Sequence, residues 1–388
     1  MHGIQTKFAP MPRPLAVRPV LSLPVRLRAD IRARGKGICI AMVDSDFVAH
    51  PDLMQPKPRI AAYVDAVNDE VYDTVPDVPL LPRHWHGTMT ACTAAGNGYL
   101  SQGVFSSLAP ESTVVLIRTM NDANRVTTDV IVRALDYVSK LAPRHNIRVV
   151  NISVYADELT QTLEHPVNRA VHSLVEQGIV VVSATGNNPR APVRPPAAAP
   201  DGLAVGGLDD KNTLVEEDNE MYHSTFGITD MGVQKPDLIA PAIYLPGPIL
   251  LSSPQQEEAA ALCAMDAMND SMLLSTAPRL MPLTKIPVST WTSRDVTVLR
   301  TAIARRISEE QIAQPYYKMV DGTSFAAPIV ASIVAQMLGI DSTLTPQEVK
   351  EILTSTARPL PNVPPIIQGA GVVQQRSALA ALTYTHDT

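Results

Sequence analysis

The chain contains an aspartate, a histidine and a serine of the kinds that together cleave amide bonds, each beside a patterned segment. Asp44 follows an apolar run at residues 37–43, His86 opens the sequence His86-Gly87-Thr88, and Ser324 precedes an apolar stretch at 329–338. A serine hydroxyl becomes a strong nucleophile when a histidine removes its proton and an aspartate orients that histidine. Alone, each is more commonly a turn residue, a structural histidine or a helix N-cap. Their order along an alternating α/β pattern favours catalysis.

The segments around these residues predict a parallel sheet covered by helices. Short apolar runs, typical of strands buried on both faces, occur at residues 37–43, 113–117, 148–154 and 179–184. Helical patterns occur at 128–141 and 166–177, and a last helix is predicted at 345–356. This alternation indicates an α/β fold with a mostly parallel central sheet and helices on both faces. Ligands in such folds bind beyond the carboxyl ends of the strands, where Asp44, Ser153 and Asn187 lie.

The position of Ser324 is favourable for a nucleophile. The stretch at 329–338 is apolar on every side, which predicts a helix buried in the core. The N-terminus of such a helix stabilises negative charge through its dipole and its unpaired amides.

Several sequence blocks, in this order, give the chain a clear resemblance to the subtilisin-like serine protease (subtilase) family. The resemblance extends from about residue 36 to residue 383. It rests on the Asp44 block through His-Pro-Asp-Leu at 50–53, His-Gly-Thr at 86–88, Val-Val-Asn-Ile-Ser at 149–153, Val-Val-Ser-Ala-Thr-Gly-Asn-Asn at 181–188, Lys-Pro-Asp-Leu-Ile-Ala-Pro at 235–241, Gly-Thr-Ser at 322–324 and Gly-Ala-Gly-Val-Val at 369–373.

This resemblance implies a three-layer subtilisin-like fold and a serine endopeptidase that works through an acyl-enzyme. Ser324 would attack the peptide carbonyl, His86 would act as general base and then acid, and Asp44 would orient His86. The Asn187 side chain and the Ser324 backbone N–H would form the oxyanion hole. The walls of the primary specificity pocket would be Ser153, Val154 and Tyr155 on one side and Ala184, Thr185 and Gly186 on the other.

Some positions depart from the family pattern. Asp46 and Tyr155 stand where glycine is usual. We interpret Asp46 as a solvated loop acid, and Tyr155 as a residue that narrows the pocket entrance. The chemistry needs no cofactor and no catalytic metal, because the triad already uses His86 of the His84/His86 pair. The resemblance does place a structural calcium near Asp52 and the loop 96–103, although that loop is poor in acids.

Composition limits the choice of partners and compartment. The formal net charge of −6 gives no basic signature of a nucleic-acid binder. No stretch approaches the roughly 20 apolar residues that cross a bilayer, and no secretory h-region begins the chain. Three scattered cysteines argue against a disulfide framework. We therefore expect a cytoplasmic protein with a peptide or protein substrate and neither a membrane nor a nucleic-acid partner.

The chain divides into a basic Pro/Arg-rich arm at 1–35 and a peptidase domain at 36–388, which carries an inserted helical subregion at about 248–315. Two amphipathic helices are predicted in the insertion. The first is capped by Ser253 and presents one face of Leu262, Met265, Met268 and Met272; the second starts near Thr292 and carries Val296, Leu299, Ile303 and Ile307. These faces either pack on the protease body or contact a protein partner or the cleft.

Two other functions are compatible with the same fold. One is a self-processing maturase that acts on its own chain or on a pathway partner. The other is a non-catalytic scaffold that binds peptides in its cleft. A complete triad together with Asn187 favours the endopeptidase over the scaffold, because peptide binding alone does not need all four residues.

Overall fold

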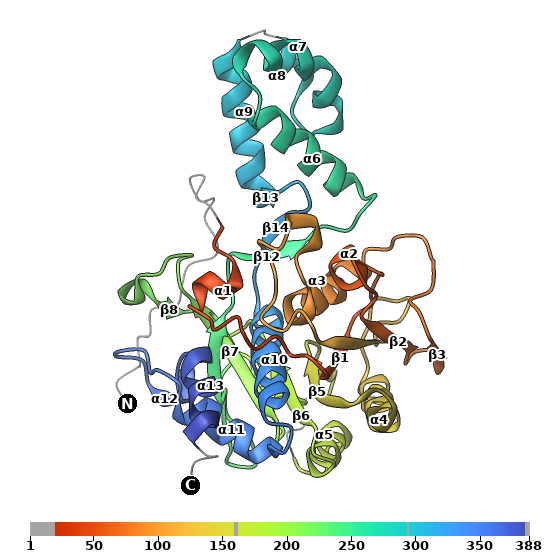
Figure 1. Cartoon of the computed structure of the whole chain (residues 1–388), viewed down its shortest axis with the longest axis vertical. Coiled ribbons are helices and arrows are strands. Elements are labelled where there is room, and N and C mark those ends of the chain that lie inside the picture. The colour runs from red at the N-terminus through yellow and green to blue at the C-terminus, as the bar shows by residue number, and fades with distance from the viewer. Residues whose placement is uncertain (1–19, 159–161, 293–294, 385–388) are drawn as a thin grey trace. The chain divides into compact units, whose positions relative to one another are not determined.

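A computed structural model describes residues 20–158, 162–292 and 295–384, coloured along the chain in Figure 1. The described residues form two compact units. The first contains Leu21–Ile243 and the chain from Asp321 onward, and the second contains Tyr244–Val320 together with Val20. Residues 1–19 of the predicted N-terminal arm lie outside the described residues.

The first unit is built on a nine-stranded sheet in which β1 (Cys39–Asp44) lies between β4 (Thr113–Arg118) and β5 (Ile147–Ile152). The main strand order is β11-β7-β6-β5-β1-β4-β2-β3. The remaining strands of the sheet are β2 (Ile60–Asp65), β3 (Glu70–Tyr72), β6 (Val180–Ala184), β7 (Leu203–Asp209), β8 (Glu220–Met221) and β11 (Leu238–Pro241). All pairs are parallel except β2 with β3 and β7 with β8. A short hairpin-like pair, β9 (Gly227–Ile228) and β10 (Gln234–Lys235), stands apart from it.

Helices cover both faces of this sheet (Figure 1), and every residue of β1 is therefore buried. On one face, Ala41 and Val43 share a hydrophobic cluster with residues of α4 (Thr128–His145) and α5 (Pro166–Glu176). On the other, α10 (Thr323–Ile340) packs against β5, β6, β7 and α3 (His84–Ala95). The predicted three-layer α/β fold is confirmed.

The smaller helices of the first unit are α1 (Leu23–Arg26), α2 (Pro51–Met54), α11 (Pro346–Ser355), α12 (Pro365–Gln368) and α13 (Gln375–Tyr384). The predicted strands and helices match the observed elements to within a few residues. The largest differences are in two helices. Helix α10 begins at Thr323, before the predicted stretch at 329–338, and α4 continues to His145 through Pro143, where the sequence pattern predicted an end at residue 141.

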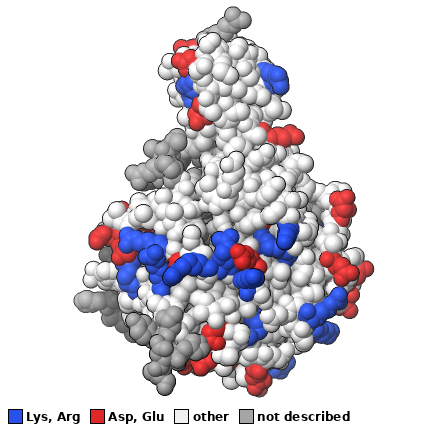
Figure 2. All heavy atoms as spheres, in the orientation of Figure 1, with Lys and Arg blue, Asp and Glu red and all other residues white. Residues whose placement is uncertain are grey.

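The described part of the N-terminal segment is anchored to the first unit by buried charge. Arg26 of α1 is buried, forms an ion pair with Asp210 and donates to the carbonyl of Ile243 at 2.8 Å. Figure 2 shows Lys and Arg side chains gathered in a band over the segment between α1 and β1. Acidic residues pair with this band, as Glu111 does with Arg34.

The second unit combines a small antiparallel sheet with helices around its own core. The sheet order is β12 (Leu245–Pro248), β14 (Tyr317–Val320), β13 (Ile312–Gln314). The helices are α6 (Pro254–Asp266), α7 (Asp270–Leu280), α8 (Val288–Thr292) and α9 (Val296–Glu309). The core includes Leu262, Met265, Leu273, Leu299 and Ile303.

Two predictions for this unit are wrong in detail. Ser253 does cap α6 by accepting the Gln256 N–H. However, the continuous Met face does not exist, because α6 ends at Asp266 and Asn269 caps a separate helix, α7. Met272 is 52% exposed on α7. The helix predicted to start near Thr292 begins at Val296 behind an Asp295 cap.

One helix of the described residues, α10, has the length and hydropathy of a membrane span. It is 83% buried inside the protein, so its apolar surface serves the core.

Candidate active site

Asp44 and His86 meet at the carboxyl end of the central strand. Asp44 is the last residue of β1 and is fully buried, and its Oδ1 lies 2.7 Å from Nδ1 of His86 in the first turn of α3. The backbone N–H of Ser45 donates to the same oxygen at 2.6 Å. The Thr90 hydroxyl, one turn further along α3, donates to Oδ2 at 2.8 Å. These contacts satisfy the buried carboxylate and fix its direction toward the imidazole.

The pairing raises the pKa of His86. Burial by itself disfavours the imidazolium and acts to lower the pKa, but the charge and the hydrogen bond of Asp44 outweigh it. The pKa of His86 therefore lies above its ordinary value. An imidazole with Nδ1 held by a carboxylate has its other nitrogen, Nε2, available for proton transfer.

Ser324 is the second residue of α10, and the residues before it shape the site. Gly322 has φ of +133°, a conformation that favours glycine, and its N–H donates to Ala242 at 2.7 Å. The Thr323 N–H and hydroxyl both donate to Oδ1 of Asn187, at 2.9 and 3.0 Å. Because these donors occupy the amide oxygen, the NH₂ group is the part of Asn187 available to a ligand.

A cavity of about 650 Å³ collects most of the predicted site residues. Its lining includes the predicted triad Asp44, His86 and Ser324, and the predicted wall Ser153, Val154 and Tyr155. The Ser153 hydroxyl donates to the Ser324 carbonyl at 3.0 Å, which links this wall to the start of α10. Among the described residues, Ser324 Oγ makes no hydrogen bond to His86, a contact that in many enzymes tightens only when substrate binds.

The other predicted wall lies beside Thr323 and does not line this cavity. Ala184 is the last residue of β6, and Thr185 is buried with its N–H on the Val205 carbonyl at 3.1 Å. The Gly186 N–H donates to the Thr323 hydroxyl at 3.1 Å. The role of these three residues in substrate binding stays a prediction.

The interpretation of Asp46 as a solvated acid is wrong. Asp46 is 2% exposed and accepts from Tyr63 at 2.7 Å and from Arg83 at 2.9 Å, while His84 lies at 3.2 Å. Burial alone would raise its pKa, but the hydrogen bonds from His84, Tyr63 and Arg83 reverse this and lower it. Arg83 directly precedes α3, so Asp46 ties down the start of the helix that carries His86. A local sequence motif could not predict these partners, because Tyr63 and Arg83 are 17 and 37 residues from Asp46 in the sequence.

The calcium site implied by the resemblance does not fit the residues present. Asp52 Oδ1 accepts the Leu100 N–H at 3.1 Å, and the Asp52 carbonyl accepts Asn97 N–H and the Arg59 guanidinium. Arg59 also donates to the carbonyls of Ala95 and Ser112. A protein cation therefore occupies the carbonyl cluster, and the loop 96–103 adds no carboxylate toward the six to eight oxygens that calcium requires.

His84 and His86 also lack the arrangement of a zinc centre. His84 and His86 contact different aspartates, Asp46 and Asp44. One other cluster of the described residues, His50, Asp52 and Cys92, places potential ligand atoms within 4.8 Å of one another. It is one ligand short of a closed tetrahedral site, and His50 already uses Nδ1 to accept the Asp52 N–H at 3.2 Å.

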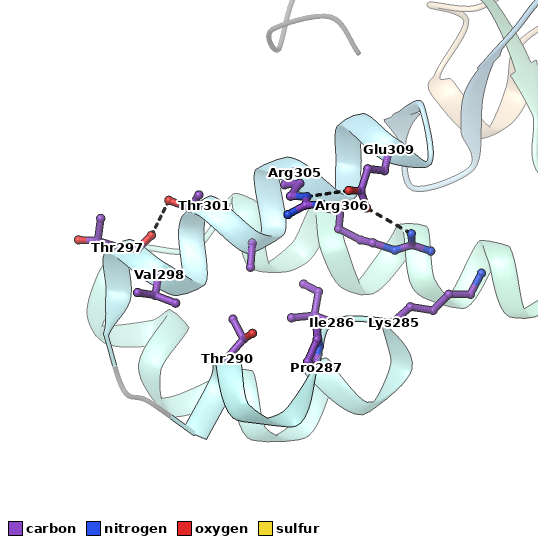
Figure 3. A pocket seen from close by; sticks show the side chains of 11 residues that line it. Lys285, Ile286, Pro287, Thr290, Thr297, Val298, Thr301, Arg305, Arg306 and Glu309 are labelled. Carbon is purple, nitrogen blue, oxygen red and sulfur yellow. Dashed lines mark hydrogen bonds and ion pairs between the residues drawn. The ribbon is translucent and has the colours of Figure 1, made fainter. Parts of the chain in front are cut away.

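A second cavity, of about 540 Å³, lies within the second unit and is shown in Figure 3. Threonine and aliphatic side chains of α8, α9 and the preceding loop line it, and Arg305 and Arg306 at its edge pair with Glu309. Its lining contains no histidine, cysteine or serine, so it offers no nucleophile–base pair.

Comparison with known proteins identifies the family of this chain. The model of the subtilase family matches residues 35–371, most of the chain. The chain therefore belongs to the subtilase family, the class of the subtilisin-type serine proteases.

Individual relatives lie at moderate sequence distance. The chain is 28% identical over 355 residues to the serine protease AprX of Bacillus subtilis (strain 168). The aligned region covers 89% of this chain and 66% of AprX. It is 28% identical to subtilisin BL of Lederbergia lenta over 46% of this chain and 58% of that protein. The chain thus spans about two thirds or less of the length of these relatives.

Solved structures share the fold at lower identity. The CspB protease of Clostridium perfringens superposes with a TM-score of 0.66 at 14% identity, covering 91% of this chain and 96% of that one. Fervidolysin from Fervidobacterium pennivorans gives 0.59 at 20% identity, covering 90% and 43%.

Proposed function

We propose that this chain is a serine endopeptidase that hydrolyses peptide bonds through an Asp44–His86–Ser324 triad. The observation that carries the proposal is the 2.7 Å contact between His86 and the buried Asp44, at a cavity that Ser324 also lines. Family membership supports the reaction class.

In the proposed mechanism, Ser324 Oγ forms a bond to the scissile carbonyl carbon while its proton passes to Nε2 of His86. The tetrahedral intermediate then collapses, the C–N bond breaks, and His86 gives the proton to the leaving amine. Water repeats the sequence on the acyl-enzyme and releases the acid product. Asp44 stays ionised throughout and stabilises the imidazolium.

The developing oxyanion would be stabilised by the NH₂ group of Asn187 and the backbone N–H of Ser324. The Asn187 amide is oriented in advance by the two donors of Thr323, so little reorganisation accompanies the reaction. The start of α10 adds its helix dipole to these donors.

The proposal is tested by peptide-library cleavage with wild type, Ser324→Ala and Ser332→Ala. Ser332 lies on the same helix, fully buried, and donates to the Ile329 carbonyl at 2.8 Å. Ser324→Ala should lose the cleavage seen in wild type, whereas Ser332→Ala should keep it. Equal cleavage by wild type and Ser324→Ala would remove Ser324 from the mechanism.

A further inference from the structure

The active-site cavity carries more positive than negative charge. Besides Asp44, the charged residues in its lining are Arg83, Arg125, Arg194 and Asp157. Arg83 pairs with Asp46 at 2.9 Å and with Asp122 at 3.0 Å, and Arg125 lies 3.9 Å from Asp157. Hydrogen bonds from Thr128 lower the pKa of Asp157, which keeps it charged. Within the described part of the chain, no carboxylate lies within 4.0 Å of Arg194.

Arg194 is held in the cavity by an aromatic ring. Its guanidinium carbon lies 5.2 Å from the ring centre of Tyr155, within the range of a cation–π contact. Nη1 lies 3.5 Å from the Ala156 carbonyl, a weak contact, and the Ala156 N–H donates to Pro195 at 2.9 Å. A cation–π contact uses no N–H donor of the guanidinium in a hydrogen bond to a carboxylate, so N–H groups remain for a planar anion. Tyr155, where the family usually has glycine, thereby acquires a role as the support of Arg194.

The same segment ties Arg194 to the nucleophile. Ser153, two residues before Tyr155, donates to the Ser324 carbonyl at 3.0 Å and accepts from Asn151 at 3.0 Å. A wall of four residues, 153–156, is thus fixed at one end to Ser324 and at the other to the Arg194–Pro195 segment. Ser324 and Arg194 line the same cavity, so a substrate side chain next to the scissile bond would share this cavity with the guanidinium.

From this arrangement we propose that Arg194, supported by Tyr155, binds a carboxylate of the peptide and makes the enzyme selective for an acidic side chain close to the cleaved bond. The inference rests on the proposed peptidase function and specifies its substrate class. A carboxylate can accept two N–H groups of a guanidinium, and the partly buried setting strengthens the pair relative to water.

The test uses pairs of neutral, end-blocked peptides. One peptide of each pair carries a single Glu and the other a single Gln at the same position, and the position is moved step by step around the cleaved bond. Wild type should cleave the Glu peptide about 10- to 100-fold more efficiently in kcat/KM at one position, the range expected for a charged hydrogen-bonded pair. Arg194→Gln should reduce this Glu/Gln ratio to about 1, and Arg194→Glu should favour a Lys peptide. Arg144→Gln, the same charge change on the surface of α4, should keep the wild-type ratio.

Binding separates failure of this inference from failure of the peptidase proposal. Ser324→Ala protein should bind the Glu peptide at least about tenfold more tightly than the Gln peptide, and this preference should vanish in the double variant with Arg194→Gln.

If wild type cleaves Glu and Gln peptides equally, the proposed acidic selectivity is wrong while the proposed peptidase function stands. If nothing is cleaved but Ser324→Ala binds the Glu peptide selectively, only the peptidase proposal fails. If an unblocked chain end is needed for the preference, the carboxylate is a C-terminus and the side-chain assignment is wrong.

Discussion

At the scale of single residues, two neighbouring carboxylates have separate tasks. Asp44 faces the His86 ring, and Asp46 faces Tyr63, Arg83 and His84. Both are buried. Asp44 thus acts on the imidazole directly, whereas Asp46 acts only through the start of α3.

Asp44→Asn should reduce kcat by about 10⁴, as expected for loss of the imidazole's orienting carboxylate. Asp46→Asn should instead lower the free energy of unfolding by about 3 kcal/mol, because it removes a buried carboxylate on which the hydrogen bonds of Tyr63 and Arg83 converge. Denaturant midpoints and kcat, measured for both variants, separate the two effects. A larger loss of kcat for folded Asp46→Asn than for Asp44→Asn would exchange the two roles.

The pH profile follows from the raised pKa of His86. Because the neutral imidazole is the base, kcat/KM should fall as the pH drops through this pKa, which lies above 6.5. Folding stability depends on pH in the opposite direction. The His86–Asp44 ion pair contributes fully to the free energy of unfolding below about pH 6.5, and this contribution is lost as the pH rises through the folded-state pKa of His86. Measurements of kcat/KM and of the free energy of unfolding between pH 5 and 9 test these two predictions. A flat kcat/KM across this range would exclude His86 as the base.

Sequence patterns name the residues of the proposed triad but not the residues that support them in the fold. Asp44, His86, Ser324 and Asn187 stand in contiguous blocks with glycine or strand signals beside them. Arg59 and Arg194 stand in no such block, and their contacts depend on the tertiary fold, which brings carbonyls or a ring from other segments to them. Contacts between segments that are distant in the sequence cannot be predicted from a local sequence pattern.

At the scale of elements, the start of α10 couples fold and chemistry. The Gly322 backbone has a positive φ, and a Cβ added there would lie 3.2 Å from Nδ2 of Asn187. The turn into the helix therefore requires glycine both for its conformation and for the space around the Asn187 amide, the proposed oxyanion donor.

Gly322→Ala should lower the free energy of unfolding by about 1–3 kcal/mol through backbone strain. It should also reduce kcat, by at most the about 10²–10³ that loss of an oxyanion donor causes. Gly339→Ala is the control on the same helix: its Cβ would meet only ordinary contacts from 3.6 Å, and alanine should stabilise the helix by about 0.5–1 kcal/mol. Thermal unfolding and kcat of both variants give the comparison. Equal effects at the two glycines would contradict the assigned role of Gly322.

Element boundaries were predictable where periodicity was continuous. The four predicted strands, β1, β4, β5 and β6, match their sequence patterns because each consists mostly of apolar residues. Helix α10 begins at Thr323, before the predicted apolar stretch at 329–338. The second unit was less predictable, since α7 buries only Leu273 and Ala277 and α8 spans five residues. The Asn269 cap that separates α6 from α7 interrupts what looked like one methionine face.

At the scale of the whole molecule, the proposed catalytic residues all belong to the first unit. The second unit, Tyr244–Val320, has a separate hydrophobic core and its own sheet. A unit with its own core can be removed without opening the core of another. The hypothesis that a protein partner binds the 248–315 region remains to be tested.

Replacing residues 252–312 with a short Gly/Ser linker should leave a folded protein that keeps the strand pair β12–β14 and the reactivity of Ser324. We expect its activity or its peptide preference to differ from wild type, because the removed helices are tethered to the segment that leads into Ser324. Circular dichroism and the same peptide library measure the two effects. An unchanged library profile, with no change in oligomer or bound partner, would end the regulatory hypothesis.

The most direct test of the central claim is covalent labelling of Ser324 by a fluorophosphonate probe, read by intact and peptide mass spectrometry. Wild type should gain one adduct, located on Ser324, at a rate that falls as His86 becomes protonated. Ser324→Ala should remain unlabelled while Ser332→Ala labels like wild type. Folded wild-type protein that gains no adduct, or gains it on another residue while Ser324 stays unmodified, would contradict the assignment of Ser324 as the nucleophile.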